Sequence, residues 1–107
     1  MALSSALFIS DTPQQRTVKL QDGSEHVLHF KQLPAADFRK FFNDLNSAND
    51  STKAQAMAWL ISASLCEPDG KPALTVKQAM VLTPSAEKAI SDAVLDVNGL
   101  GEKQGKD

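Results

Sequence analysis

The sequence predicts an α+β fold that is mainly α, with an N-terminal β-hairpin packed on a small bundle of three to four helices. Apolar residues alternate on both sides of Asp22-Gly23, which is typical of two paired strands joined by a tight turn. Farther along the chain, apolar residues recur at helical spacing from Phe38 onward. The 107 residues are enough for one domain rather than two.

The two ends of the chain differ in composition from the part between them. Residues 1–15 are mostly small and polar, with a short apolar stretch through Ile9, and they predict a flexible N-terminal arm. Residues 101–107 are charged and glycine-rich, which predicts a flexible C-terminal tail. We therefore expect a single domain over residues 16–100.

The hairpin is predicted from two alternating segments. Residues 16–20 place Val18 and Leu20 on one face of the first strand. Residues 25–33 form the second strand and place three side chains on one face: His26, Leu28 and Phe30. Two strands alone are marginally stable in water, so their apolar face should lie on a helix.

A helix is predicted to follow, with Pro34 in its first turn, where a missing N–H costs nothing. Its apolar stripe consists of Phe38, Phe41, Phe42 and Leu45. One interpretation makes the stripe a part of the core that faces the hairpin. The alternative is a groove that receives an apolar helix from another protein.

The next helix is predicted from a cap at Asp50 or Ser51 to about Leu65. Residues 54–66 include no charged side chain, and a helix that is apolar on all sides is buried in a core or in a subunit interface. Trp59 is the largest side chain on this helix, and tryptophan is favoured at interface centres. Trp59 therefore fits either a core or an interface. The candidate partner-binding residues are therefore Phe38, Phe41, Phe42, Trp59 and Leu60.

The last third of the chain shows clear turn and cap signals. Pro68-Asp69-Gly70 predicts a turn, and Thr75 with Gln78 forms a capping box for a short helix through Leu82. Thr83-Pro84 then begins the last helix with a cap and a first-turn proline. Gly99 is expected to end that helix in the left-handed conformation. Its inner stripe is predicted to be Ala86, Ile90, Ala93, Val94 and Val97.

Residues able to carry out chemistry are scarce. An odd separation on a strand places His26 and His29 on opposite faces, so they cannot share a metal. Cys66 would need a nearby histidine to act as a nucleophile, and a buried structural thiol is the favoured interpretation. Asp92 and Asp96 lie one helical turn apart, on what we expect to be a solvated face without a pocket. We expect a protein that is not an enzyme and that needs no metal or cofactor.

Charge and cysteine content restrict the partners and the compartment. The formal net charge is −2, so the chain lacks the basic footprint of a nucleic-acid-binding protein. One cysteine cannot form an intramolecular disulfide and fits a reducing cytosol. The N-terminal apolar stretch is too short for a signal peptide core or a membrane span. We expect a cytoplasmic protein that binds neither nucleic acid nor membrane.

Two landmarks in the second half of the chain indicate a family. One is the stretch Leu65-Cys66-Glu67-Pro68-Asp69-Gly70-Lys71-Pro72, and the other is Asn98-Gly99-Leu100-Gly101. With the Asp22-Gly23 hairpin before them, they make residues 16–101 resemble the tail assembly chaperones of lambda-like, long-tailed bacteriophages. The chain departs from the family pattern over residues 76–84, where a more acidic short helix would be expected.

The resemblance implies a chaperone that binds the tape measure protein, keeps it soluble and promotes assembly of the tail tube. It implies action in the bacterial host cytoplasm and absence from the mature virion. A frameshift-extended form would reach the major tail tube protein, and Gly105-Lys106 is compatible with a slippery site in the gene. Many copies of such a protein would bind along one long partner, where weak contacts act together. The resemblance therefore leaves a homo-oligomer open.

Two other functions stay open at this point. One is a different phage morphogenesis protein, such as a head–tail adaptor, which would persist in the virion. The other is a small DNA-binding regulator that uses the last two helices as a helix-turn-helix. The first turns of the last helix carry one glutamate and one lysine, and Asp92 and Asp96 would repel phosphate, which disfavours that interpretation.

Overall fold

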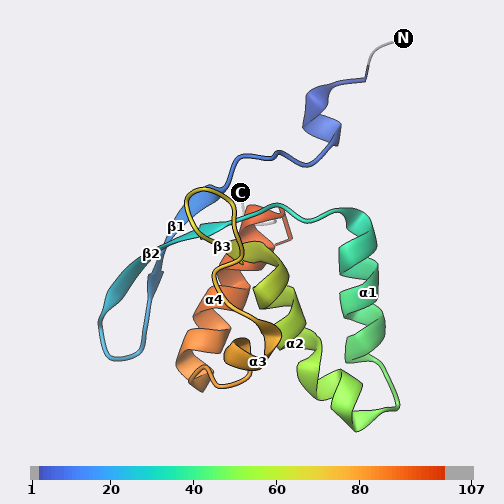
Figure 1. Cartoon of the computed structure of the whole chain (residues 1–107), viewed down its shortest axis with the longest axis vertical. Coiled ribbons are helices and arrows are strands. Elements are labelled where there is room, and N and C mark those ends of the chain that lie inside the picture. The colour runs from blue at the N-terminus through green and yellow to red at the C-terminus, as the bar shows by residue number, and fades with distance from the viewer. Residues whose placement is uncertain (1–2, 101–107) are drawn as a thin grey trace.

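The computed structural model describes residues 3–100, in which a small twisted sheet and four helices follow a short N-terminal turn (Figure 1). The elements in chain order are η1 (Ser5–Leu7), β1 (Gln14–Lys19), β2 (Glu25–Phe30), α1 (Ala35–Leu45), α2 (Asp50–Ser64), β3 (Leu65–Cys66), α3 (Val76–Ala79) and α4 (Pro84–Val97). The predicted fold class is confirmed: the hairpin β1–β2 packs on the helices.

The hairpin forms around the predicted turn, although β1 begins at Gln14, within the segment predicted to be a flexible arm, and ends at Lys19. β1 and β2 pair antiparallel, with Arg16 opposite Leu28. Gly23 has φ +91°, and its N–H donates to the carbonyl of Leu20, so the turn needs the left-handed conformation that glycine adopts at no steric cost. β2 ends at Phe30 rather than at residue 33, because β1 begins opposite Phe30 and the backbone beyond it bonds to other elements.

A third strand, which we did not predict, extends the sheet. β3 pairs antiparallel with β2 on the side away from β1, with Cys66 opposite His29. The N–H of Lys31 donates to the carbonyl of Ser64 at 2.8 Å, and the Ser64 hydroxyl donates to the carbonyl of Lys31 at the same distance. The end of α2 is therefore tied directly to the sheet.

The helix α1 begins one residue later than predicted, since Pro34 occupies the N-cap position rather than the first turn. Its principal neighbour is α2, not the hairpin, and Figure 1 shows α1 beside α2 and apart from β1 and β2. The prediction that its aromatic stripe faces the hairpin is therefore wrong. Phe38 and Phe41 are buried, whereas Phe42 lies half exposed.

The helix α2 is capped by Asn49, whose side chain accepts a hydrogen bond from the N–H of Thr52. The predicted caps Asp50 and Ser51 instead lie in the first turn, which is exposed. The expectation of a helix buried on all sides holds only for the later turns. The buried side chains of α2 are Ala56, Ala58, Leu60, Ile61 and Ser64.

The helices α3 and α4 are capped as predicted. Thr75 and Gln78 form a reciprocal capping box, although α3 ends at Ala79 rather than at Leu82. Thr83 caps α4, with Pro84 in its first turn. Gly99 adopts φ +76° and, with Leu100, returns N–H groups to the last carbonyls of α4. Four of the five predicted inner residues of α4 are buried and Ala93 is partly buried.

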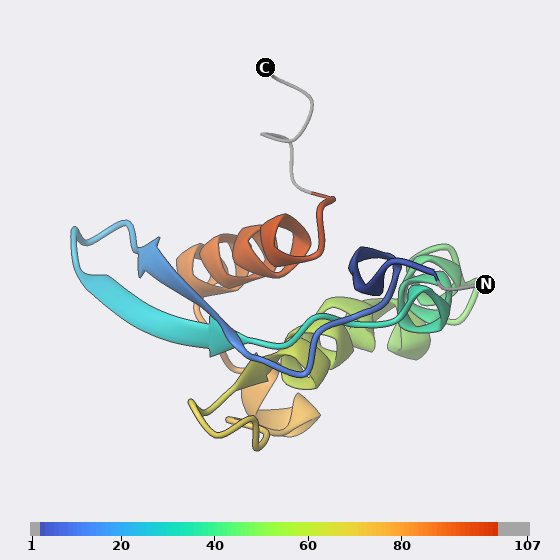
Figure 2. The ribbon, with the colours of Figure 1, turned by 90° about the horizontal axis from the view of Figure 1, so that it is seen from above.

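The core lies between the sheet and the helices. In the view of Figure 2, α4 covers one side of the hairpin, α2 passes through the middle, and α1 lies at the far end from the hairpin turn. The largest fully buried side chains are Phe30, Leu60, Ile61 and Val94, one from the sheet and three from α2 and α4. This arrangement leaves one side of α1 open to the N-terminal segment.

Candidate functional site

The structure separates the five predicted partner-binding residues into two kinds. Phe38, Phe41 and Leu60 are buried in the core, where they stabilise the fold. Trp59 is partly buried, and Lys40 Nζ lies 4.6 Å from its ring centroid in a cation–π contact. Phe42 is 48% exposed and is the only one of the five that presents a large apolar surface.

Phe42 is held in place by the buried rings beneath it. Its ring centroid lies 5.3 Å from that of Phe41 and 6.4 Å from that of Phe38, both in tilted contacts. These distances are within the range of favourable aromatic pairs, which fix ring orientation as well as adding area. An exposed ring on a rigid base is preorganised for contact with another apolar surface.

The N-terminal segment brings a second set of exposed apolar side chains next to Phe42. Leu7 and Phe8 are 69% and 62% exposed, and Ile9 is also exposed. The segment is shaped by Ser4, whose hydroxyl accepts from the N–H of Ala6, and by η1. It is tied to the body where the N–H of Ser10 donates to Gln32 Oε1 at 2.6 Å. Leu7, Phe8, Ile9 and Phe42 therefore form one cluster of exposed apolar side chains, whereas other exposed apolar residues of the described chain, such as Val81, lie outside it.

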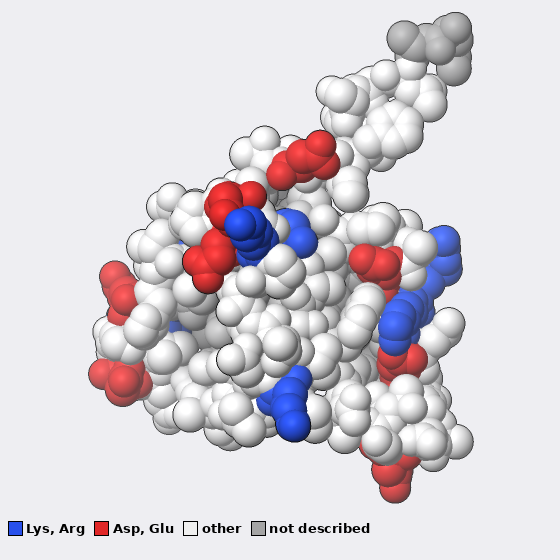
Figure 3. All heavy atoms as spheres, viewed as in Figure 1, with Lys and Arg blue, Asp and Glu red and all other residues white. Residues whose placement is uncertain are grey.

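These residues enclose a shallow groove, here called the apolar groove, with a volume of about 490 Å³. Its walls are the N-terminal segment, the loop before α1, one side of α1 and the end of α4. Its lining residues are Ala6, Leu7, Phe8, Ile9, Gln32, Leu33, Ala35, Phe38, Arg39, Phe42, Asn98 and Leu100. Arg39 is the only charged residue among them. On the face of the molecule seen in Figure 3, charged side chains form a few small clusters and most of the surface is uncharged.

Leu100 and the N-terminal apolar residues were not among the predicted site residues. Leu100 is 51% exposed, and its N–H donates to the carbonyl of Leu95 at 2.7 Å, which completes the cap of α4. The apolar stretch through Ile9 was visible in the sequence, but only tertiary structure places it opposite Phe42. The signal that could have found this surface was the run of three large apolar residues, Leu7, Phe8 and Ile9, in an arm of mostly small and polar residues.

Neither sequence landmark carries a reactive group toward a cavity. The Leu65–Pro72 stretch continues β3 into a tight turn, in which Gly70 has φ +91° and Lys71 donates its N–H to Asp69 Oδ1. Cys66 is buried there, and desolvation raises the pKa of its thiol, as expected for a structural cysteine. Within residues 3–100, no group of three or more histidine, cysteine or acidic side chains is placed to hold a metal ion.

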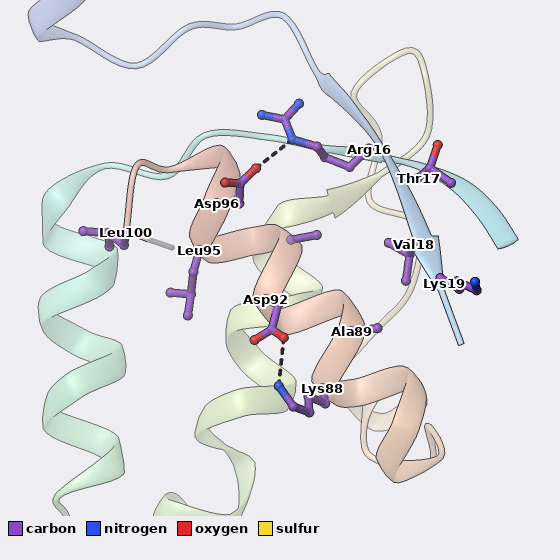
Figure 4. Close-up of a pocket in the computed structure, with 11 residues that line it drawn as sticks. Arg16, Thr17, Val18, Lys19, Lys88, Ala89, Asp92, Leu95, Asp96 and Leu100 are labelled. Carbon is purple, nitrogen blue, oxygen red and sulfur yellow. Dashed lines mark hydrogen bonds and ion pairs between the residues drawn. The ribbon is translucent and has the colours of Figure 1, made fainter. Parts of the chain in front are cut away.

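A second groove, here called the β1-edge groove, lies between β1 and α4 and has a volume of about 470 Å³ (Figure 4). Arg16 Nε reaches Asp96 Oδ2 at 3.0 Å across it, and Lys88 pairs with Asp92 at the same distance along α4. The prediction of a solvated face holds for Asp92, which is exposed, whereas the prediction that no pocket lies there is wrong. Both aspartates line this groove, because α4 lies alongside β1.

Comparisons with protein-family models, with curated proteins and with solved structures found no significant match. None of the helices in the described part of the chain is long and apolar enough to cross a membrane. The geometry of the two grooves is therefore the structural basis for assigning a function.

Proposed function

We propose that this protein is a tail assembly chaperone of a long-tailed phage, and that its apolar groove binds the tape measure protein. The single observation that carries the proposal is the concentration of exposed apolar side chains around one groove: Leu7, Phe8, Ile9, Phe42 and Leu100. The family resemblance of the two turn landmarks supplies the identity of the partner.

The chemistry of the groove suits an apolar helical face. A tape measure protein is a very long helical chain whose apolar faces aggregate until the tail tube encloses them. A helix presents such a face as side chains at positions i, i+3, i+4 and i+7, which a shallow apolar groove can receive. Arg39 at the rim adds a cation that an acidic residue on the same helix could pair with.

The groove is small, and this also suits the proposed role. A volume of about 490 Å³ accommodates only a few side chains, so one copy would bind weakly. Many copies along one long partner would cover its apolar face together and release it as the tube grows. This mode of action is non-enzymatic and needs no cofactor. It proceeds in the bacterial host cytoplasm and leaves no copy in the mature virion.

Two further partners belong to the proposal. A frameshift-extended form of the chain would carry an additional segment that gathers the major tail tube protein around the tape measure. Copies of the chain contact each other while they coat the partner, which makes a homo-oligomer part of the same assembly. The predicted slip site at Gly105-Lys106 lies outside the described residues.

Co-expression with the tape measure protein encoded in the same phage genome tests the proposal. Wild-type chaperone should move the tape measure protein from the insoluble to the soluble fraction. The double variant Phe8→Ser with Phe42→Ser should lose most of this effect, since it removes two of the exposed rings. Val81→Ser is the matched control, because Val81 is exposed but lies between α3 and α4, away from the groove.

Mass analysis of purified virions separates this function from its nearest alternative. A chaperone is absent from the virion, whereas a head–tail adaptor is present at a fixed copy number. Finding this chain at fixed stoichiometry in intact particles would therefore contradict the proposal, as would a tape measure protein whose solubility does not respond to wild-type chaperone.

A further inference from the structure

The outer edge of β1 carries backbone hydrogen-bonding groups that no other strand of the described chain uses. The sheet order is β1–β2–β3, so β1 is an edge strand. An exposed edge is a template for pairing with another extended chain, and proteins usually cover or block it. What lies along this edge is the β1-edge groove, lined by the consecutive residues Arg16, Thr17, Val18 and Lys19.

Two hydrogen bonds fix which residues of β1 face outward. The N–H of Leu20 donates to the carbonyl of Ser24, which follows the register in which Val18 is opposite His26. Residues directly opposite each other in an antiparallel pair alternate between bonded and non-bonded pairs, so the even-numbered residues of β1 bond to β2. The bond from the Lys31 N–H to the Ser64 carbonyl agrees with this assignment. It shows that the backbone groups of odd-numbered residues of β2 point toward β3, so those of even-numbered residues point toward β1.

The outward-facing backbone groups of β1 therefore belong to Gln15, Thr17 and Lys19. The carbonyl of Gln15 accepts from the Arg16 guanidinium at 2.9 Å, which leaves the groups of Thr17 and Lys19 open along the groove. In Figure 4 the side chain of Val18 points toward α4, whereas those of Thr17 and Lys19 point away from it. The latter two residues line the groove through their backbone.

We infer that the β1-edge groove binds an extended peptide segment of a partner, which adds to the sheet as an antiparallel fourth strand beside β1. Main-chain hydrogen bonds to Thr17 and Lys19 would supply the affinity, as in other cases of strand addition. Peptide side chains that face α4 would contact Val18, Ala89 and Ala93, so they should be small or apolar.

Charge selects the residues on the other face of the added strand. Arg16 is paired with Asp96 and Lys88 with Asp92, while Lys19 has no ion-pair partner among the residues that the structure describes. A residue directly opposite Lys19 on a neighbouring strand lies within reach of its side chain. An acidic residue at that position would form a cross-strand pair, so the fitting peptide is acidic on this face.

The position of α4 favours a bare strand over a second copy of the chain. Paired strands lie only about 4.8 Å apart, whereas packed helices need about 8–10 Å between their axes. A second copy that paired through the same edge would bring its own α4 to the same face, beside the α4 that already packs on β1. An isolated extended segment carries no such helix.

A designed peptide tests the inference on the full chain. The probe is an acetylated and amidated heptapeptide, Glu-Val-Thr-Val-Thr-Val-Glu, whose valines would face α4 and whose first glutamate would lie opposite Lys19. Titration followed by amide NMR should give saturable shifts at Gln15, Thr17 and Lys19. No shifts along β1 at millimolar peptide, shifts confined to the apolar groove, or a peptide-independent dimer through β1 would overturn the inference.

Two N-methylated versions of the peptide test the register. In an antiparallel strand the threonine N–H groups face β1 and the valine N–H groups face solvent. Methylating both threonine nitrogens should weaken binding by at least about tenfold, whereas methylating two valine nitrogens should leave it nearly unchanged. Equal losses from the two peptides, or a greater loss from the valine version, would contradict the antiparallel register.

Protein variants give an independent readout. Thr17→Pro removes an outward N–H without breaking a bond to β2 and should abolish peptide binding, whereas Thr17→Val should retain it. Lys19→Glu should weaken the glutamate-ended peptide and bind the corresponding lysine-ended peptide more tightly. If Thr17→Pro fails to fold, the N-methylated peptides and the Lys19→Glu charge exchange still decide the question. Unchanged preference in Lys19→Glu would contradict the predicted cross-strand pair.

Discussion

The side chain of Asn98, at the end of α4, accepts a hydrogen bond from the backbone N–H of Leu33 at 2.7 Å. Its amide nitrogen also donates to the carbonyl of Val94 at 2.8 Å. One residue thus caps its own helix and holds the loop that leads into α1. This gives the Asn98-Gly99-Leu100 landmark a structural role, because the loop and the end of α4 form two walls of the apolar groove.

Asn98→Ala should lower the free energy of unfolding by about 1–3 kcal/mol, because it leaves the N–H of Leu33 without its acceptor. The matched control is Asn46→Ala. Asn46 caps α1 in the same conformation and donates to the carbonyl of Phe42, but it is exposed and has no bond across the fold. Urea unfolding of both variants measures the difference, and equal losses would show that the Leu33 bond adds nothing.

Phe41 and Phe42 should respond differently to truncation although they are adjacent in the sequence. Phe41 is 3% exposed, so Phe41→Ala should cost about 3–5 kcal/mol of unfolding free energy. Phe42→Ala should cost only about 1 kcal/mol, the worth of its ring contacts. Chemical denaturation tests this prediction. Similar losses for the two variants would mean that Phe42 is a core residue rather than a surface one.

Cys66 should be a slow nucleophile. The side chain is 4% exposed, and burial raises the pKa of its thiol, so less thiolate is present at any given pH than in a free cysteine. Iodoacetamide should alkylate the native protein more slowly than the urea-unfolded chain, with a pH midpoint shifted upward. Equal rates in the two states would contradict the burial of this residue.

Amide hydrogen exchange along β1 should alternate. The N–H groups of Arg16 and Val18 face β2 and should exchange at least about tenfold more slowly than those of Thr17 and Lys19. NMR-detected exchange gives each rate separately. Uniform protection would mean that the outer edge of β1 is already covered in solution, and uniform fast exchange would mean that the hairpin is not formed.

Local sequence signals predicted the local parts of the structure. The Asp22-Gly23 turn, the Thr75–Gln78 capping box and the glycine after α4 depend on residues within a few positions of each other. Their geometry follows from backbone conformations and caps that the residue types favour. The same reasoning chose Asp50 or Ser51 over Asn49 as a cap, because each of the three can accept the same hydrogen bond.

The candidate sites depend on contacts that no local pattern records. Arg16 and Asp96 are 80 positions apart, and nothing in either segment indicates that they pair. The two residues of β3 are too few to show an alternating pattern, so the third strand was missed. The aromatic stripe of α1 predicted burial for Phe38, Phe41 and Phe42 alike. However, α2 covers only part of that face, which leaves Phe42 exposed at the apolar groove.

Binding of a helical tape measure fragment to the purified protein tests the central claim most directly. Calorimetric titration should show saturable binding that the Phe8→Ser and Phe42→Ser double variant weakens at least about tenfold, while Val81→Ser binds like the wild type. Undiminished binding by the double variant, or no binding by the wild-type protein at millimolar fragment, would contradict a partner site in the apolar groove.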